Sequence, residues 1–174
     1  MKLTAPLVRF PLLALALSAT AFSAIAADPA PAPTPTPAAP SAPALDFGDF
    51  SSATLTGKAW AALQSKNYPA VLGYTNKCID SFKAQAVQMQ AKLKEPAPKD
   101  SANQYWALND VGTCYFIQGK ALDDQGDKKG AIAAYKALVD SLSFSQCWDP
   151  SGWFWKPADA ARKRLAELQF DAAQ

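Results

Sequence analysis

The chain has 174 residues, which is room for one modest domain once terminal segments are set aside. It carries 17 Lys and Arg, 15 Asp and Glu and no histidine, so its formal net charge is +2. This near balance gives no excess of positive charge with which to bind nucleic acid or an anionic membrane. The lack of histidine excludes histidine-dependent triads and zinc sites. The three cysteines form no C-x-x-C pair, so we expect neither a metal nor a cofactor.

Residues 1–27 have the pattern of a signal peptide. Lys2 and Arg9 precede an apolar run at 11–17, and Ala24-Ile25-Ala26 forms an A-x-A cleavage site. The run is short and alanine-rich for a retained membrane anchor. We therefore expect cleavage, no membrane span afterwards and a periplasmic or secreted protein. Without Lys2 and Arg9, the 17 basic residues become 15, which balance the 15 acidic residues.

A linker rich in proline and alanine is expected at 28–46. Seven of the seventeen residues at 28–44 are proline, which fixes φ and removes backbone donors, so neither helix nor sheet ladders can form there. Such a segment favours extended polyproline II structure. It is either a solubilising tail or a spacer that holds the following domain away from a surface.

Residues 47–170 are expected to form one all-α domain of about five helices, two of them long. The first helix is predicted at 54–66 and the second from Pro69 to about Lys94, where prolines stop it. A capping-box pattern at Ser101 is expected to open the third helix. No stretch alternates apolar and polar residues over a useful length, so we predict no sheet.

The last two helices have clear start signals. Gly126-Asp127 predicts a turn with Asp127 as the N-cap of the fourth helix, and Pro157 begins an amphipathic fifth helix. Between them lies an aromatic loop at 144–156.

The third and fourth helices resemble a tetratricopeptide repeat (TPR), a helical hairpin of about 34 residues with small residues at its close contacts. Gly119 and Ala131 would let the two helices approach closely, while Tyr115 and Tyr135 fill the space beside them. The positions that match the repeat are Tyr115, Gly119, Leu122, Gly126, Asp127, Ala131, Tyr135 and Leu138. A degenerate repeat is expected at 55–79, although Lys58 stands where the family has an apolar residue. The alternative is a plain helical bundle.

The TPR resemblance implies a concave face lined by the first helix of each hairpin, a surface suited to an extended peptide or a protein tail. Trp60 and Phe116 could instead pack in the core. The carboxylate clamp of chaperone-binding relatives is not expected, because Ile117 stands in place of its asparagine. The residues expected on this face are Trp60, Gln64, Asn109, Thr113, Phe116 and Lys120.

The aromatic loop contains Trp148, Trp153, Phe154 and Trp155, four large rings within eight residues. They either cover the open apolar end of the helical stack or form a platform for a sugar or a peptide. Of these, Trp153 is expected to stay exposed, beside Gly152. The segment at 146–157 is similar to small exported bacterial proteins, some of which carry the label "beta-glucanase precursor".

A catalytic function is not the favoured interpretation. A glycosidase needs two carboxylates that flank the bond, and the only glutamates, Glu95 and Glu167, have no evident reason to converge. The candidate aspartates are Asp110, Asp123, Asp124 and Asp149, of which 123 and 124 are expected at a solvated helix end. The leading hypothesis is an exported scaffold that binds a protein or peptide partner in the cell envelope. The alternatives are a carbohydrate-binding or glucan-acting protein that uses the loop at 148–155, and a structural protein that packs with its own copies.

An exported chain meets an oxidising compartment, where the three cysteines could form one disulfide. Cys78 and Cys114 lie nearly symmetrically about the turn at 96–98, which could bring them level on antiparallel helices. The alternatives are buried free thiols, or a bridge that includes Cys147.

Overall fold

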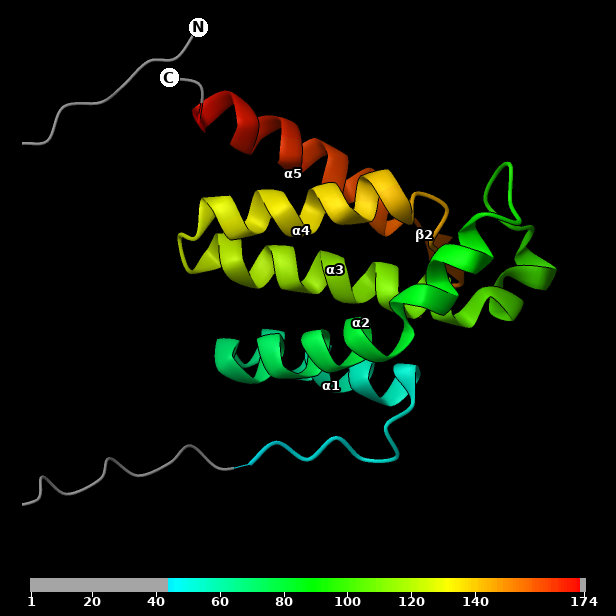
Figure 1. Cartoon of the computed structure of the whole chain (residues 1–174), viewed down its shortest axis with the longest axis horizontal. Coiled ribbons are helices and arrows are strands. Elements are labelled where there is room, and N and C mark those ends of the chain that lie inside the picture. Colours follow the sequence, from blue (N-terminus) through cyan, green and yellow to red (C-terminus); the bar gives the residue numbers. More distant parts are fainter. Residues whose placement is uncertain (1–43, 173–174) are drawn as a thin grey trace, which may run out of the picture. The chain divides into compact units, whose positions relative to one another are not determined.

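The computed structural model describes residues 44–172, and the expected signal peptide and most of the expected linker lie outside this range. Five α-helices make up most of the described part, as the sequence predicts (Figure 1). They are α1 (Ser52–Gln64), α2 (Tyr68–Gln90), α3 (Trp106–Asp124), α4 (Lys128–Ser141) and α5 (Pro157–Ala172). A 3₁₀ helix, η1 (Lys99–Tyr105), precedes α3, and two short strands, β1 (Cys147–Asp149) and β2 (Trp153–Trp155), lie between α4 and α5. The expectation of no sheet was therefore wrong.

Local capping chemistry begins three of the helices. Ser51, Asn67 and Asp127 cap α1, α2 and α4, and in each case a side-chain oxygen accepts a backbone N–H from the first turn. The predicted cap at Asp127 is confirmed, and α5 begins at Pro157 as expected. The first helix begins and ends two residues before its predicted bounds of 54–66, and α2 ends at Gln90 rather than near Lys94.

The capping box expected at Ser101 was a wrong prediction. The Ser101 hydroxyl donates to the carbonyl oxygen of Pro98, 3.2 Å away, and α3 begins only at Trp106. The physical reason is a tertiary anchor: Ala102 is fully buried, and its carbonyl oxygen accepts a hydrogen bond from the Asn109 amide at 2.8 Å. This contact holds the segment in a 3₁₀ helix, against the local signal.

Helix α3 is the centre of the described domain, since it contacts α1, α2, α4 and α5 (Figure 1). The turns at 65–67 and 125–127 are so short that the helices they join, α1 with α2 and α3 with α4, must run antiparallel. Apolar side chains fill the space on several sides of α3, and the largest fully buried ones include Leu55, Val71, Leu108, Val111, Ile117 and Leu138.

The expected close contact between α3 and α4 is present. Gly119 is buried, and a Cβ atom placed on it would lie 2.5 Å from the ring of Tyr135. Ala131 is fully buried on α4. Small side chains at these two positions therefore allow the two helices to pack as the sequence predicts.

Contacts with the helices begin inside the expected linker. The side chain of Leu45 packs against Gly73 of α2, and the carboxylate of Asp46 lies 2.8 Å from the ammonium nitrogen of Lys58 on α1. Lys58 also lies over the ring of Tyr74 at 5.9 Å. These partners explain how a lysine is accommodated where an apolar residue was expected.

None of the helices between residues 44 and 172 is both long enough and apolar enough to cross a bilayer.

Candidate functional site

The predicted aromatic loop folds into a two-stranded antiparallel hairpin. Its paired residues are Cys147 with Trp155, Trp148 with Phe154, and Asp149 with Trp153. The turn closes by a bond from the Gly152 amide to the Asp149 carbonyl at 2.9 Å, and Gly152 has a φ of +97°, which side chains rarely tolerate. Because side chains alternate along a strand, 147, 149, 153 and 155 share one face of the hairpin, and 148 and 154 share the other.

One face of the hairpin packs on α1 and α3. The ring of Trp155 lies 5.1 Å from that of Phe116 and 6.4 Å from that of Trp60, measured between centroids. Phe116 in turn lies 6.1 Å from Tyr135 of α4. This aromatic contact joins two residues of the predicted concave face, Trp60 and Phe116, to the aromatic loop, which the sequence analysis treats separately.

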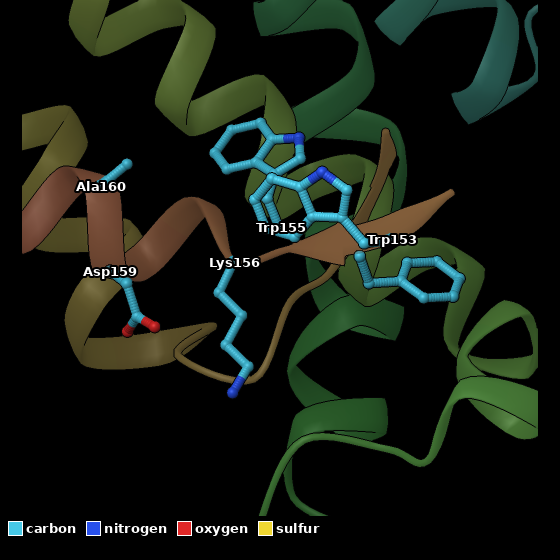
Figure 2. Close-up of a pocket in the computed structure, with 6 residues that line it drawn as sticks. Trp153, Trp155, Lys156, Asp159 and Ala160 are labelled. Atoms are coloured by element: carbon cyan, nitrogen blue, oxygen red, sulfur yellow. The ribbon is translucent and has the colours of Figure 1, made fainter. Parts of the chain in front are cut away.

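Between α1 and the hairpin lies a groove of about 830 Å³, which we call the tryptophan groove. Its lining residues are Ala53, Thr56, Gly57, Trp60, Gln64, Asp110, Cys147, Trp148, Asp149, Pro150, Trp153 and Trp155. A neighbouring hollow of about 420 Å³ lies where β2 meets α5 (Figure 2). Figure 2 shows the side chains of Trp153 and Trp155 close together there, with Lys156 pointing away from both indoles.

Two indoles of the hairpin are held half in water. Trp148 is 50% exposed and Trp153 is 55% exposed, although each ring has a large apolar area to bury. The expected exposure of Trp153 is thus present. Trp148 stacks edge-on against Phe154 at 5.1 Å, and the Lys99 ammonium lies over its ring at 5.5 Å. Trp148 thus has an aromatic and a cationic neighbour, whereas no lysine or arginine of the described residues lies over the Trp153 ring.

The groove contains two carboxylates in different environments. Burial raises the pKa of Asp110 above its ordinary value, although the Ser52 hydroxyl donates to this carboxylate at 2.5 Å and opposes the shift. Hydrogen bonding to Ser151, whose amide lies 2.8 Å from the carboxylate, lowers the pKa of Asp149. Asp110 thus takes up a proton at a higher pH than Asp149.

Of the six residues predicted on the concave face, Trp60 and Gln64 line the tryptophan groove. The other four do not: the hairpin and the segment before it cover Asn109, Thr113 and Phe116, and Lys120 is exposed outside the groove. Asn109 is buried: its amide nitrogen bonds to Ala102, and its oxygen accepts the backbone N–H of Gln146 at 2.9 Å. Asn109 therefore anchors the segment that leads into β1.

The remaining three predicted residues have other partners. Thr113 is buried and its hydroxyl donates to the Asn109 carbonyl at 2.8 Å. Phe116 is half-buried behind Trp155, and Lys120 faces outward, with its ammonium 3.4 Å from Asp124. Asn109 and Thr113 also border a smaller hollow of about 380 Å³ between α1, α3 and the hairpin.

The expectation of a solvated helix end at 123 and 124 was wrong for Asp123. The Arg164 guanidinium of α5 binds its carboxylate through two nitrogens, at 2.6 and 3.0 Å, and Lys128 of α4 binds it as well. These cations hold the pKa of Asp123 at about 2. Asp123 thus joins α3, α4 and α5 and lies outside the tryptophan groove.

Cys78 and Cys114 lie side by side in the core, both fully buried. Their sulfur atoms are 4.0 and 3.3 Å from the Thr56 hydroxyl oxygen, and burial together with the neighbouring Cys78 thiol raises the pKa of Cys114. Cys147 is half-buried at the floor of the groove. All three are free thiols in this structure. Among residues 44–172, no group of three or more Cys, Asp or Glu side chains is placed to hold a metal ion.

Sequence reasoning did not predict that Thr56 and Cys147 line the groove, or that Asp110 and Asp149 line the same groove. The only available signal was the Asp-Pro-Ser-Gly turn at 149–152, which indicates a hairpin between its flanking tryptophans. Comparisons with protein-family models, curated protein sequences and solved structures found no significant match to the chain.

Proposed function

We propose that this chain is an exported, TPR-like helical scaffold that binds a segment of a partner protein in the cell envelope. The observation that supports this proposal best is the tryptophan groove, where Trp148 and Trp153 remain half-exposed beside the packed pair Trp60 and Trp155. Exposed aromatic side chains at a hollow are typical of binding surfaces, because they supply large contact area at low entropic cost. An open groove lined by aromatic side chains suits an extended peptide.

A capture experiment with matched variants tests this function. The full chain and its Trp153→Ala variant are used to capture partners from an envelope extract of the organism that encodes the chain. Phe170→Ala is the control, because Phe170 is 67% exposed on α5 and does not line the groove. We expect a partner that the wild type and Phe170→Ala retain and that Trp153→Ala loses. Equal capture by all three chains would contradict binding in the groove.

A second candidate function is binding or cleavage of a glucan, as the beta-glucanase label suggests. Its specific support is the pair Asp110 and Asp149 in a groove with exposed indoles, because their pKa values are shifted in opposite directions. One carboxyl group with a raised pKa and a second with a lowered pKa, lining the same groove, are what a glycosidase acid and its partner require. Asp110 would be the acid.

Affinity electrophoresis in glucan-containing gels, with reducing-sugar release measured in parallel, tests this second function. Retardation that Trp153→Ala abolishes would support binding, and sugar release that Asp110→Asn abolishes would support cleavage. A chain that is neither retarded nor releases sugar excludes the glucans used.

A further inference from the structure

The charged residues of the tryptophan groove all have one sign. Asp110 and Asp149 are the only ionisable Asp, Glu, Lys or Arg residues among those that line it in the described structure. Hydrogen bonding to Ser151 keeps Asp149 ionised. Asp110 accepts the hydroxyl of Ser52 of α1 and is the more buried of the two carboxylates. The groove therefore presents negative charge to whatever enters it.

The indoles act in the same electrostatic sense. The face of an indole ring is the negative part of its quadrupole, and it attracts the cations of lysine and arginine side chains. The fold already contains one such pair, because the Lys99 ammonium lies over Trp148 at 5.5 Å. No lysine or arginine within residues 44–172 lies over the Trp153 ring in this way. The exposed face of the Trp153 ring is therefore free to contact a ligand.

The hairpin register brings the two attractive groups together. Asp149 and Trp153 are directly paired across the strands, and their side chains share one face of the hairpin. Directly opposed residues have Cβ atoms only about 4.5–5.5 Å apart. A single cation can therefore approach the indole face and the carboxylate at the same time.

The lysines nearest to the groove do not line it. Lys156 lies in the neighbouring hollow with Asp159, and its side chain points away from Trp153 and Trp155 (Figure 2). Lys58 pairs with Asp46 and borders a different hollow, together with Leu45 and Tyr74. The negative charge of the tryptophan groove is thus not balanced by a lysine that lines it.

We infer that the tryptophan groove selects a partner segment that carries a lysine or arginine flanked by apolar residues, with the cation held between Trp153 and Asp149. The inference rests on the proposed peptide-binding function and adds the chemistry that the groove recognises. The apolar flanks would pack on Trp60 and Trp148, while the cation meets the only charged groups of the lining. A neutral or acidic segment would gain the apolar contacts and lose the electrostatic ones.

A peptide selection tests the inference. A library of displayed dodecapeptides is selected on the full chain and, in parallel, on Trp153→Ala. An enriched peptide is then synthesised in its basic form and with each Lys or Arg replaced by Gln. Both peptides are titrated against the wild type and Asp149→Asn, an isosteric change in which the asparagine oxygen can still accept the Ser151 amide. Far-UV circular dichroism confirms that the variants are folded.

We expect peptides enriched on the wild type to contain Lys or Arg, and the Gln form to bind about 3- to 30-fold more weakly. Asp149→Asn should weaken the basic peptide and leave the Gln peptide unchanged. Enriched peptides without basic residues, or equal affinities for the two forms, would overturn the charge selectivity and leave peptide binding standing. No peptide enriched over the Trp153→Ala selection would overturn the proposed function, and the inference with it.

Discussion

At the scale of single residues, glycine has opposite roles in two helices of this chain. Gly119 faces the Tyr135 ring, and a Cβ there would lie 2.5 Å from it. Gly57, in the middle of α1, has no neighbouring atom within 4 Å of the same added group. The first glycine is required by packing, whereas the second costs helix propensity without a packing reason.

The two glycines therefore form a matched pair for mutation. Gly119→Ala should lower the free energy of unfolding by about 1–3 kcal/mol, because the ring and the two helices must shift apart. Gly57→Ala should raise it by about 0.5–1 kcal/mol, because alanine favours the helix and meets nothing. Chemical denaturation of each variant measures both changes. A stabilised Gly119→Ala would show that α3 and α4 do not approach as closely as described.

At the scale of elements, two fully buried free thiols lie side by side between α2 and α3. Cys78 and Cys114 lie beside the same Thr56 hydroxyl, at 4.0 and 3.3 Å. Oxidised glutathione should convert them to a disulfide by thiol–disulfide exchange, in which the two thiols lose their hydrogens and glutathione is reduced. The bridge should add about 2–4 kcal/mol to the free energy of unfolding.

Alkylation after oxidation, followed by mass spectrometry of the unfolded chain, detects this bridge. We expect one alkylated thiol, at Cys147. Cys147→Ser should still form the bridge, and Cys114→Ser should not. Three alkylated cysteines, or a bridge that includes Cys147, would contradict the pairing of Cys78 with Cys114.

Besides the apolar packing of α5, one carboxylate joins α3, α4 and α5 by ion pairs. Asp123 binds Arg164 and Lys128, and its pKa is about 2 in the folded chain against an ordinary 3.8. A lowered pKa stabilises the folded state above the ordinary pKa, and this stabilisation is lost as the pH falls through the folded value. Asp123→Asn should cost about 1–2 kcal/mol at neutral pH.

The pH dependence distinguishes this ion pair from a simple packing loss. The difference in free energy of unfolding between the wild type and Asp123→Asn should be constant above about pH 5 and shrink toward pH 2. Urea denaturation at several pH values measures it. The corresponding variant of the neighbouring residue, Asp124→Asn, is the control, because that carboxylate has one exposed partner, Lys120. A difference that does not change with pH would rule out the charge as its cause.

The helices could be predicted from sequence because their signals are local. Side chains repeat every three or four residues, and caps such as Asp127 act on the amide groups next to them. The two strands of the hairpin could not be predicted in the same way. Each has only three residues, too few for an alternation of apolar and polar side chains to be recognised. The 3₁₀ helix η1 was missed for a different reason. The hydrogen bond from the Asn109 amide to the Ala102 carbonyl joins η1 to the first turns of α3, and no capping rule describes such a bond.

At the scale of the whole described domain, the decisive event is the docking of the hairpin on α1 and α3. The sequence places Trp60 on the predicted concave face and Trp153 in the aromatic loop. In the structure, Trp155 contacts Trp60 and Phe116, and Trp60 and Trp153 line the same groove. This contact joins residues far apart in the chain, so no local pattern could place it. The same docking removes Asn109 and Thr113 from the expected surface and buries them.

The chain supplies its own probes for the central claim, that this groove is where the ligand binds. Five tryptophans are present, and four of them line the groove. The fifth, Trp106, packs edge-on against Phe82 of α2, with ring centroids 5.6 Å apart, and does not line it. Each indole N–H gives a separate NMR signal that reports contact at its own ring.

The most direct measurement is a titration of the isotope-labelled full chain with the enriched basic peptide, followed through these five indole signals. We predict that the signals of Trp148 and Trp153 shift progressively and saturate together, while that of Trp106 stays in place. A titration in which the peptide binds and Trp106 shifts, but Trp148 and Trp153 do not, would place the binding site elsewhere and contradict the account.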